Sequence, residues 1–350
     1  MPLVLESTET RGEYAVLIGR VHWLANNALP RVPVRRLLGE RRGDGKVGSL
    51  LLAGKPRWAG YLPSRYFVGT PRVERLGSYP LHRMEKVIDT LRDDRDLVIV
   101  RADKISIARS FQGDYFRVPE WVRCVLPVPD RLEDLKSLNH SVKDEFRQIR
   151  RWKLSWRFST SEADLERFYK QYYTTYTRIR YGPEAYCRGL SFLRRRFAQG
   201  CIVWVESEGR QVAGAFVQKG GSKLSLWALG IHPDELHWLK QGAMAALYMG
   251  SINVAQIQGC KELDFRGTRP SLDDGLLKYK LKWGGRVAPF PEQLYEYLVG
   301  FSDQAEHLLR HTPLITTCGD GLLGFYSGQT RRPVPGVEGP VEWKNEPAKI

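Results

Sequence analysis

The stretch with the most chemically capable residues is 263–285, LDFRGTRPSLDDGLLKYKLKWGG. Its first residues, Leu-Asp-Phe, have the pattern of a buried strand end, where side chains of α/β sheets reach their ligands. Asp264 at this end could orient or deprotonate an incoming amine. It could equally cap the following turn or pair with Arg266 or Arg269. The sequence leaves these roles equally open.

The rest of this stretch offers cations and a helix start. Arg269 precedes Pro270 in a rigid extended turn and could bind a carboxylate or phosphate through both arms of its guanidinium. Asp273 and Asp274 stand where N-capping residues are expected. The helix that follows has the amphipathic pattern of alternating cations and apolar residues: Lys278, Lys280 and Lys282 with Leu277, Leu281 and Trp283. On the pattern alone, these lysines are expected to face solvent.

A second group of candidate residues is strongly basic. Residues 140–196 contain 14 Lys and Arg against 6 Asp and Glu, a net charge of +8. On the helix expected from Ser141, the residues Arg147, Arg150 and Arg151 share one face and could bind phosphates or be simply solvated. The tyrosines from Tyr169 to Tyr176 have helical spacing and are interpreted as packing residues.

Size and charge limit the class of protein. The chain has 350 residues, 42% of them hydrophobic, which is enough for about two domains with full cores. Its net charge of +15 and pI near 9.6 indicate contact with something anionic, such as nucleic acid, a phosphorylated cofactor or a membrane surface. No transmembrane run and no signal-peptide pattern is found in the sequence, so a soluble, cytoplasmic protein is expected.

The cysteines and histidines suggest no metal or disulfide. Five cysteines are scattered without a CxxC pair, which argues against a disulfide framework and a zinc site: Cys124, Cys187, Cys201, Cys260 and Cys318. Buried structural cysteine is much the more common alternative to a nucleophile here. His232 and His237 lack a partner at ligand spacing, so no metal is expected.

The elements that must position these residues alternate between helix and strand. The first part predicts a helix over 81–94 and strands over 47–53, 96–103 and 121–129. Helices are then expected from a capping box at Ser141-Val-Lys-Asp144, over 160–180 and over 183–198. An antiparallel meander over 201–206, 211–217 and 223–230 precedes a helix over 237–258 and a strand over 260–265. This order predicts an α/β fold.

The strand order, the run SLWALGIHPDELHWLKQGAMAALYMGSINVAQIQGCKELDF and the closing GTRP…DDGLLKYKLKWGG resemble the Fem-like branch of the GNAT acyltransferase superfamily. The resemblance implies tandem GNAT-like mixed sheets flanked by helices, the first half degenerate. The expected domains are a degenerate one over 1–130, an acyltransferase domain over 131–300 and an extension over 301–350, with a flexible tail from about 328.

The resemblance also implies a donor site. Relatives hold the CoA pyrophosphate at a helix N-terminus after a glycine-containing loop, by the helix dipole and unsatisfied N–H groups. The matching residues are Lys240, Gln241, Gly242 and Ala243, although the second small residue of the family pattern is out of place. A plain helix start with a packing glycine is the alternative. Trp227, on the strand that lines the acyl channel in this fold, could shape the acceptor or acyl pocket.

Tyr279 and Lys280 match an aromatic–Lys pair that the resemblance places at the acyl carbonyl, where Lys280 could stabilise the oxyanion. The implied activity is N-acyl transfer from acyl-CoA to an amine, or to a hydroxyl, by direct attack and without a metal. The acceptor would be a small molecule or a peptide amine. The alternative is Fem-type aminoacyl transfer from aminoacyl-tRNA, for which tRNA would be the partner. A non-enzymatic, basic nucleic-acid-binding module is a third and weaker interpretation.

Overall fold

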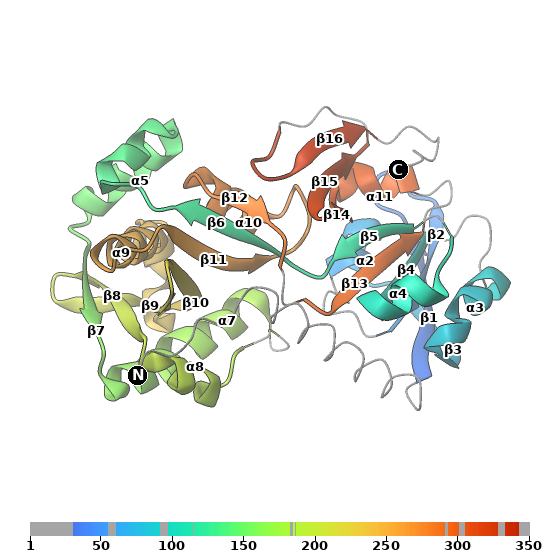
Figure 1. Ribbon diagram of the computed structural model, residues 1–350, viewed down its shortest axis with the longest axis horizontal. Helices are drawn as coiled ribbons and strands as arrows, with labels where there is room; N and C mark the ends of the chain where they lie inside the picture. The colour runs from blue at the N-terminus through green and yellow to red at the C-terminus, as the bar shows by residue number, and fades with distance from the viewer. Residues whose placement is uncertain are drawn as a thin grey trace, which may run out of the picture. The chain divides into compact units, whose positions relative to one another are not determined.

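The computed structural model describes residues 31–54, 61–91, 97–113, 115–182, 185, 187–290, 293–300, 305–327 and 333–342 (Figure 1). The chain forms two compact units. Unit 1 consists of residues up to Val122, Thr268–Asp274 and the segment from Ala288 onward, and unit 2 consists of Arg123–Gly267 and Gly275–Val287. The units therefore interleave along the sequence, whereas continuous domains over 131–300 and 301–350 were expected.

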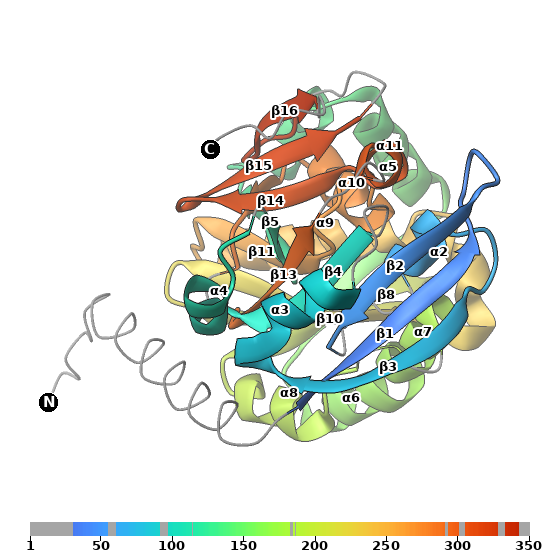
Figure 2. The ribbon, with the colours of Figure 1, turned by 90° about the vertical axis from the view of Figure 1, so that its right-hand side faces the viewer.

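Unit 1 is built on a six-stranded mixed sheet in the order β3-β1-β2-β4-β13-β5 (Figure 2). Its strands are β1 (Arg31–Glu40), β2 (Val47–Ala53), β3 (Arg72–Pro80), β4 (Leu97–Asp103), β5 (Tyr115–Pro119) and β13 (Tyr295–Gly300). β1 pairs antiparallel with β2 and β3, β2 runs parallel to β4, and β13 pairs antiparallel with β4 and β5. The helices of unit 1 are α2 (Tyr61–Tyr66), α3 (Met84–Leu91), α4 (Lys104–Ser110) and α11 (Ala305–His311).

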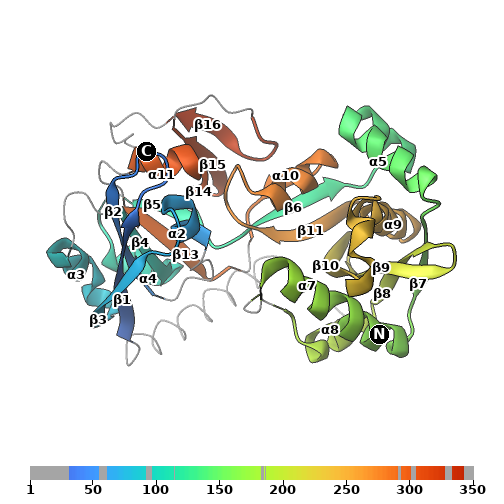
Figure 3. The ribbon, with the colours of Figure 1, turned by 180° about the vertical axis from the view of Figure 1, so that it is seen from behind.

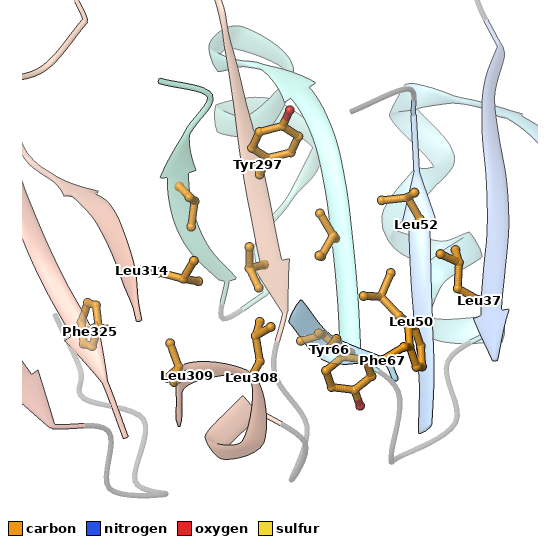
Figure 4. Packing of buried hydrophobic residues seen from close by; sticks show 14 residues of the cluster. Leu37, Leu50, Leu52, Tyr66, Phe67, Tyr297, Leu308, Leu309, Leu314 and Phe325 are labelled. Atoms are coloured by element: carbon orange, nitrogen blue, oxygen red, sulfur yellow. The ribbon is translucent and has the colours of Figure 1, made fainter. Parts of the chain in front are cut away.

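The central strands of this sheet are apolar on both faces. Leu50 and Leu52 of β2 belong to one buried cluster, shown in Figure 4, and Leu51 and Ala53 belong to another. Because successive strand residues point to opposite faces, a strand covered on both sides has a continuous apolar run. This explains why the runs at 47–53 and 97–100 could be predicted as strands from the sequence.

A three-stranded sheet completes unit 1. It has the order β14-β15-β16, with β14 (Leu314–Cys318), β15 (Gly321–Tyr326) and β16 (Glu338–Glu342). β16 lies within the tail that was expected to be flexible and pairs in parallel with β15. Residues 328–332 and 343–350 of that tail lie outside the described residues.

Unit 2 is built on a seven-stranded sheet in the order β12-β6-β11-β10-β9-β8-β7 (Figure 3). Its strands are β6 (Val122–Pro127), β7 (Ser155–Ser159), β8 (Gly200–Ser207), β9 (Arg210–Gly220), β10 (Lys223–Ile231), β11 (Glu262–Thr268) and β12 (Arg286–Ala288). β8, β9 and β10 form the predicted antiparallel meander. β10 and β11 run parallel but pair only over Lys223–Ser225 and Glu262–Asp264, after which the paired ladder ends.

Helices cover both faces of this sheet. One face carries α6 (Glu162–Arg167), the π-helical stretch η3 (Phe168–Tyr173) and α8 (Leu190–Phe197), which share a buried cluster with Trp204 of β8. Between η3 and α8, α7 (Thr174–Tyr181) lies against β10. The other face carries α9 (Ala243–Ile257), where the site of a Cβ on Gly250 lies 2.7 Å from Val203 of β8. Neighbouring residues Val203 and Trp204 thus point to opposite faces. α5 (His140–Arg151) packs against α9, and α10 (Gly275–Lys282) follows β11.

The two sheets share one arrangement around their parallel strand pairs. In unit 1, β4 runs parallel to β2, α4 follows β4, and β13 lies between β4 and β5 in the sheet. In unit 2, β11 runs parallel to β10, α10 follows β11, and β6 lies between β11 and β12. In each sheet the inserted strand, β13 in unit 1 and β6 in unit 2, comes from a part of the sequence distant from its two neighbours. The predicted fold class, tandem mixed α/β sheets flanked by helices, is confirmed.

Several predicted helix starts were wrong. α5 begins at His140, and its N-cap is Asn139, whose Oδ1 accepts a hydrogen bond from the Val142 N–H at 3.0 Å. The helix predicted over 237–258 is in two parts, a 3₁₀ stretch η4 (Pro233–Leu239) and then α9. The helix predicted over 183–198 begins only at Leu190, while residues 183, 184 and 186 lie outside the described part.

Candidate active site

Asp264 of β11 and Ser225 of β10 form the last residue pair between these two parallel strands. Its side chain is 1% exposed, and its Oδ1 accepts a hydrogen bond of 2.7 Å from the backbone N–H of Arg266. Its Oδ2 lies 3.3 Å from Nη1 of Arg266 and 3.9 Å from Nη1 of Arg123. Arg266 has a φ of 60°, an unfavourable backbone conformation for a residue with a Cβ. Among the roles that the sequence left open, these contacts favour turn capping and pairing with Arg266.

Lys280 lies inside the protein, so of the two interpretations that the sequence left open, a solvated lysine and a site residue, its burial argues against the solvated one. Its side chain is 3% exposed, and Nζ donates hydrogen bonds to the carbonyl oxygens of Arg266 at 2.9 Å and Gly267 at 3.1 Å. The same turn is therefore held by Asp264 at its N–H side and by Lys280 at its C=O side. A buried ammonium needs such charge-assisted partners. These contacts favour a positioning role for Lys280.

Tyr279 packs in an aromatic group beside Lys280. Its ring centre lies 5.2 Å from that of Tyr248, and the ammonium of Lys282 lies 4.4 Å above it. Burial, with a smaller contribution from the Glu145 carboxylate, raises the pKa of Tyr279 far above the usual value of a phenol. The Tyr279 hydroxyl therefore stays protonated at physiological pH and can donate a hydrogen bond.

Arg269 belongs to unit 1 rather than to the unit that contains Asp264 and Lys280. Its Nη1 lies 3.9 Å from Oδ2 of Asp274, which is itself buried. Asp274 directly precedes α10, as predicted for a helix start. The predicted role of Arg269 in binding a carboxylate or phosphate stays a prediction.

Trp227 is the centre of a cationic and aromatic group that sequence reasoning largely missed. The guanidinium Cζ atoms of Arg266, Arg188 and Arg196 lie 4.0, 4.8 and 4.9 Å from the centre of the Trp227 ring. We call these four residues the Arg–Trp cluster. Phe192 of α8 packs on Trp227 with ring centres 5.2 Å apart. Arg188 and Arg196 also stack on the Phe192 ring. Sequence reasoning singled out Trp227 as a possible pocket residue, but gave no sign of which arginines would contact it.

The start of α9 has the features that were expected of a phosphate site. Gly242 is its N-cap, with a φ of 94° and no side chain to cap the first turn. The first intrahelical bond of this turn runs from the Ala246 N–H to the Gly242 oxygen, so the N–H groups before it lack α-helical partners. Lys240 is exposed, and the first turn holds no acidic residue. These properties favour an anion at this point.

Gly242 also has a packing role. A Cβ there would lie 3.2 Å from Cβ of Gln148 on α5. The two interpretations that the sequence left open, a phosphate site and a packing glycine, are therefore compatible. Oε1 of Gln241 is buried without a hydrogen-bond partner in the described part of the chain.

The three arginines of α5 lie on its exposed side. Arg147, Arg150 and Arg151 are exposed, while Val142, Phe146 and Ile149 are buried as predicted. Arg147 pairs with Asp144 at 2.6 Å. An exposed helix face of this kind can either be solvated or bind phosphates, so the structure leaves both roles open.

Two of the buried cysteines, Cys124 and Cys201, lack the environment of a nucleophile. Burial raises the pKa of Cys124 and of Cys201 to about 11, so both thiols are protonated at neutral pH. Within the described ranges, no group of His, Cys, Asp and Glu is arranged to hold a metal ion. Nor does that part of the chain contain a helix with the length and apolar character that a membrane crossing requires.

Comparison with known proteins identifies the class of unit 2. Residues 136–281 match the family model described as "Acetyltransferase (GNAT) domain". This segment is therefore similar to a family of transferases, and the resemblance to the GNAT superfamily predicted from the sequence is confirmed for these residues. No curated protein sequence matches the chain significantly.

Solved structures with a similar fold include FemX, at 13% identity and a TM-score of 0.40 over 88% of this chain and 100% of that one. They also include L-PGS from Bacillus licheniformis, at 12% identity and a TM-score of 0.36, over 77% of this chain and 84% of the other. A GCN5-related N-acetyltransferase from Kribbella flavida is similar at 14% identity and a TM-score of 0.31, over 81% and 94%.

Proposed function

We propose that this protein is an N-acyltransferase of the Fem-like GNAT branch, which moves an acyl group from acyl-CoA to an amine or hydroxyl acceptor. The observation that carries the proposal is the match of residues 136–281 to the GNAT acetyltransferase domain. The parallel pair β10 and β11 supports it, because the two strands stop pairing after three residues, directly beside Trp227 and Arg266. An acyl group would react at this point of divergence.

The start of α9 would hold the phosphates of the donor. The orphan N–H groups of its first turn, the positive end of its dipole and the exposed Lys240 all favour a diphosphate. The absence of an acidic residue in the first turn removes a competing negative charge. The residues that the structure presents therefore fit the group that the proposal requires.

The reaction needs no covalent intermediate with the enzyme. The amine nitrogen attacks the thioester carbonyl, the C–N bond forms, the C–S bond breaks, and the CoA sulfur leaves as the thiolate. The proton lost by the amine ends on that sulfur or in solvent. Much of the rate gain comes from holding the two substrates together. Asp264 and Lys280 contribute by fixing the backbone at Arg266 and Gly267 from both sides.

Aminoacyl transfer from aminoacyl-tRNA is the second candidate. The observation that favours it is the exposed basic side of α5, with Arg147, Arg150 and Arg151, in a segment with a net charge of +8. A polyanion that contacts several such side chains would bind with a steep salt dependence.

The donor site can be tested with Lys240→Gln. We expect this change to weaken coenzyme A binding about tenfold in a calorimetric titration, since it removes one charge-assisted contact to phosphate. Lys278→Gln, at an exposed lysine of α10, is the matched control and should leave the affinity unchanged. Equal affinities for the two variants, or no binding of coenzyme A by the unaltered protein, would contradict the proposed donor site.

A further inference from the structure

A cavity of about 490 Å³ lies in unit 2, near the points where β10 and β11 begin. The described residues that line it include Gly200 at the start of β8, Lys219 at the end of β9, Gly221 in the turn after β9, and Gln258, the C-cap of α9. Trp227, beside the strand divergence, lies six residues beyond Gly221, about 20 Å of extended chain. The cavity is therefore separate from the proposed point of acyl transfer.

Gln258 brings an unsatisfied hydrogen-bond acceptor to this cavity. Its Oε1 atom is buried and has no hydrogen-bond partner in the described part of the chain. A buried amide oxygen without a donor is destabilising, so such atoms usually have a partner in the protein, in water or in a ligand. Because Gln258 lines the cavity, a ligand bound there can supply the missing donor.

Lys219 provides the one charged side chain among the described residues that line the cavity. Its Nζ donates a hydrogen bond of 2.7 Å to the Gln258 carbonyl oxygen, which places the ammonium beside the residue that holds the unsatisfied acceptor. An ammonium has three N–H donors, and within the described ranges no other acceptor takes the remaining two. A carboxylate bound to them would form a charge-assisted pair.

The rest of the lining is small or polar. A Cβ on Gly221 would meet no atom within 4 Å, so the turn after β9 leaves open space next to Lys219. Gln199 and Thr160 add side chains that can both donate and accept hydrogen bonds. A cavity of this volume can hold a small molecule, and its lining suits a polar one.

We propose that this cavity binds a ligand in which an amide N–H stands next to a carboxylate, as in an N-acylated amino acid or at the C-terminal end of a peptide. The carboxylate binds the Lys219 ammonium, and the amide N–H donates to Oε1 of Gln258. Both protein groups lie at Gln258, so the donor and the anion of the ligand must be adjacent. The site does not depend on the proposed function.

The first test is a pair of matched ligands in NMR titrations of the full chain. N-acetylglycine has the amide N–H and the carboxylate, whereas N-acetylsarcosine has a methyl group in place of the amide hydrogen. We expect saturable binding of N-acetylglycine in the millimolar range and about tenfold weaker binding of N-acetylsarcosine. Acetylated triglycine then distinguishes the two sources of the group, because tighter binding than N-acetylglycine indicates a peptide and equal binding indicates an N-acylated amino acid.

The second test uses variants of the two protein groups. Lys219→Gln should weaken N-acetylglycine binding about tenfold, because it removes the charge-assisted contact. Lys261→Gln, at an exposed lysine outside the cavity lining, should change it less than twofold. Gln258→Met should also weaken binding about tenfold but leave the thermal midpoint unchanged or raised, because the buried Oε1 that it removes has no partner in the described chain.

Four results would overturn the proposal. N-acetylglycine might show no saturable binding up to about 20 mM, well above the expected dissociation constant. The two matched ligands could bind equally, or Lys219→Gln and Lys261→Gln could weaken binding equally. A clearly lowered midpoint in Gln258→Met would mean that this side chain bonds within the protein and needs no ligand. Because the titrations need no turnover, they stay decisive whether or not acyl transfer is found.

Discussion

Lys280→Ala is expected to lower the free energy of unfolding by about 3 kcal/mol, because it leaves two backbone acceptors without their donor and opens a small cavity. The Lys280 ammonium donates to the carbonyl oxygens of Arg266 and Gly267, and the side chain is almost fully buried. The effect should exceed that of an ordinary substitution because Arg266 also has an unfavourable positive φ that its surroundings must maintain. Chemical denaturation measures the change directly.

Two companion variants separate the causes. Lys280→Met keeps most of the side-chain volume and should recover the cavity part of the loss but not the hydrogen-bonding part. Lys278→Ala, on the exposed side of the same helix, should change stability by less than about 0.5 kcal/mol. If Lys280→Ala proved as stable as Lys278→Ala while acyl transfer disappeared, Lys280 would act on the substrate rather than on the fold.

Gly230→Ala should destabilise unit 2 by a similar amount, about 3 kcal/mol, the upper part of the usual range for overpacking. The new Cβ would lie 2.4 Å from the carbonyl oxygen of Tyr172 and 2.9 Å from Cα of Tyr173. These are backbone atoms of the π-helical stretch η3, so no side-chain rotation can relieve the overlap. Either β10 or η3 must shift, and both carry buried residues of the same core.

Gly220→Ala is the matched control for this substitution. Gly220 ends β9 in the same sheet, and a Cβ there would meet no atom within 4 Å. Thermal unfolding of the two variants should therefore show a lowered midpoint for Gly230→Ala and an unchanged or slightly raised one for Gly220→Ala. Equal midpoints would mean that η3 is not held against β10 as closely as the structure describes.

Local patterns predicted most strands of the core, because their burial follows directly from residue order. The meander of β8, β9 and β10 has long apolar runs separated by turn residues such as Glu208-Gly209, and it was found where expected. β13 was not predicted, because it returns from beyond residue 290 to pair between β4 and β5. Pairing between segments about 190 residues apart leaves no signal in the local pattern.

The candidate site could be predicted from the sequence only where the position of a side chain depends on residues close to it in the sequence. Asn139 and Ser141 are both residue types that cap helices well, and Asn139 is the N-cap of α5. The Asn139 amide also donates a hydrogen bond of 2.9 Å to the Lys282 carbonyl oxygen. That contact spans about 140 residues and could not be inferred from spacing. Helical periodicity alone could not place Lys280 inside the protein, because the carbonyl oxygens that hold it there belong to the end of β11.

The Arg–Trp cluster shows the same limit most clearly. Its members come from three separate parts of the sequence. Arg188 and Arg196 belong to α8 and the residues just before it, Trp227 belongs to β10, and Arg266 belongs to β11. Trp227 alone was predicted to line a pocket, because the family resemblance implies that role for its strand. The three arginines converge on it only after α8 packs on the sheet through Phe192.

The most direct test of the proposed activity is a transfer assay in which acyl-CoA and aminoacyl-tRNA are offered as donors with the same panel of amines, with amino acids and phosphorylated amines included. The proposed function predicts release of the CoA thiol in a one-to-one ratio with acylated amine, at a rate proportional to the protein concentration. It predicts no loss of the aminoacyl group from the tRNA beyond spontaneous hydrolysis. Transfer from aminoacyl-tRNA to an amine, with no thiol released from any acyl-CoA, would contradict it.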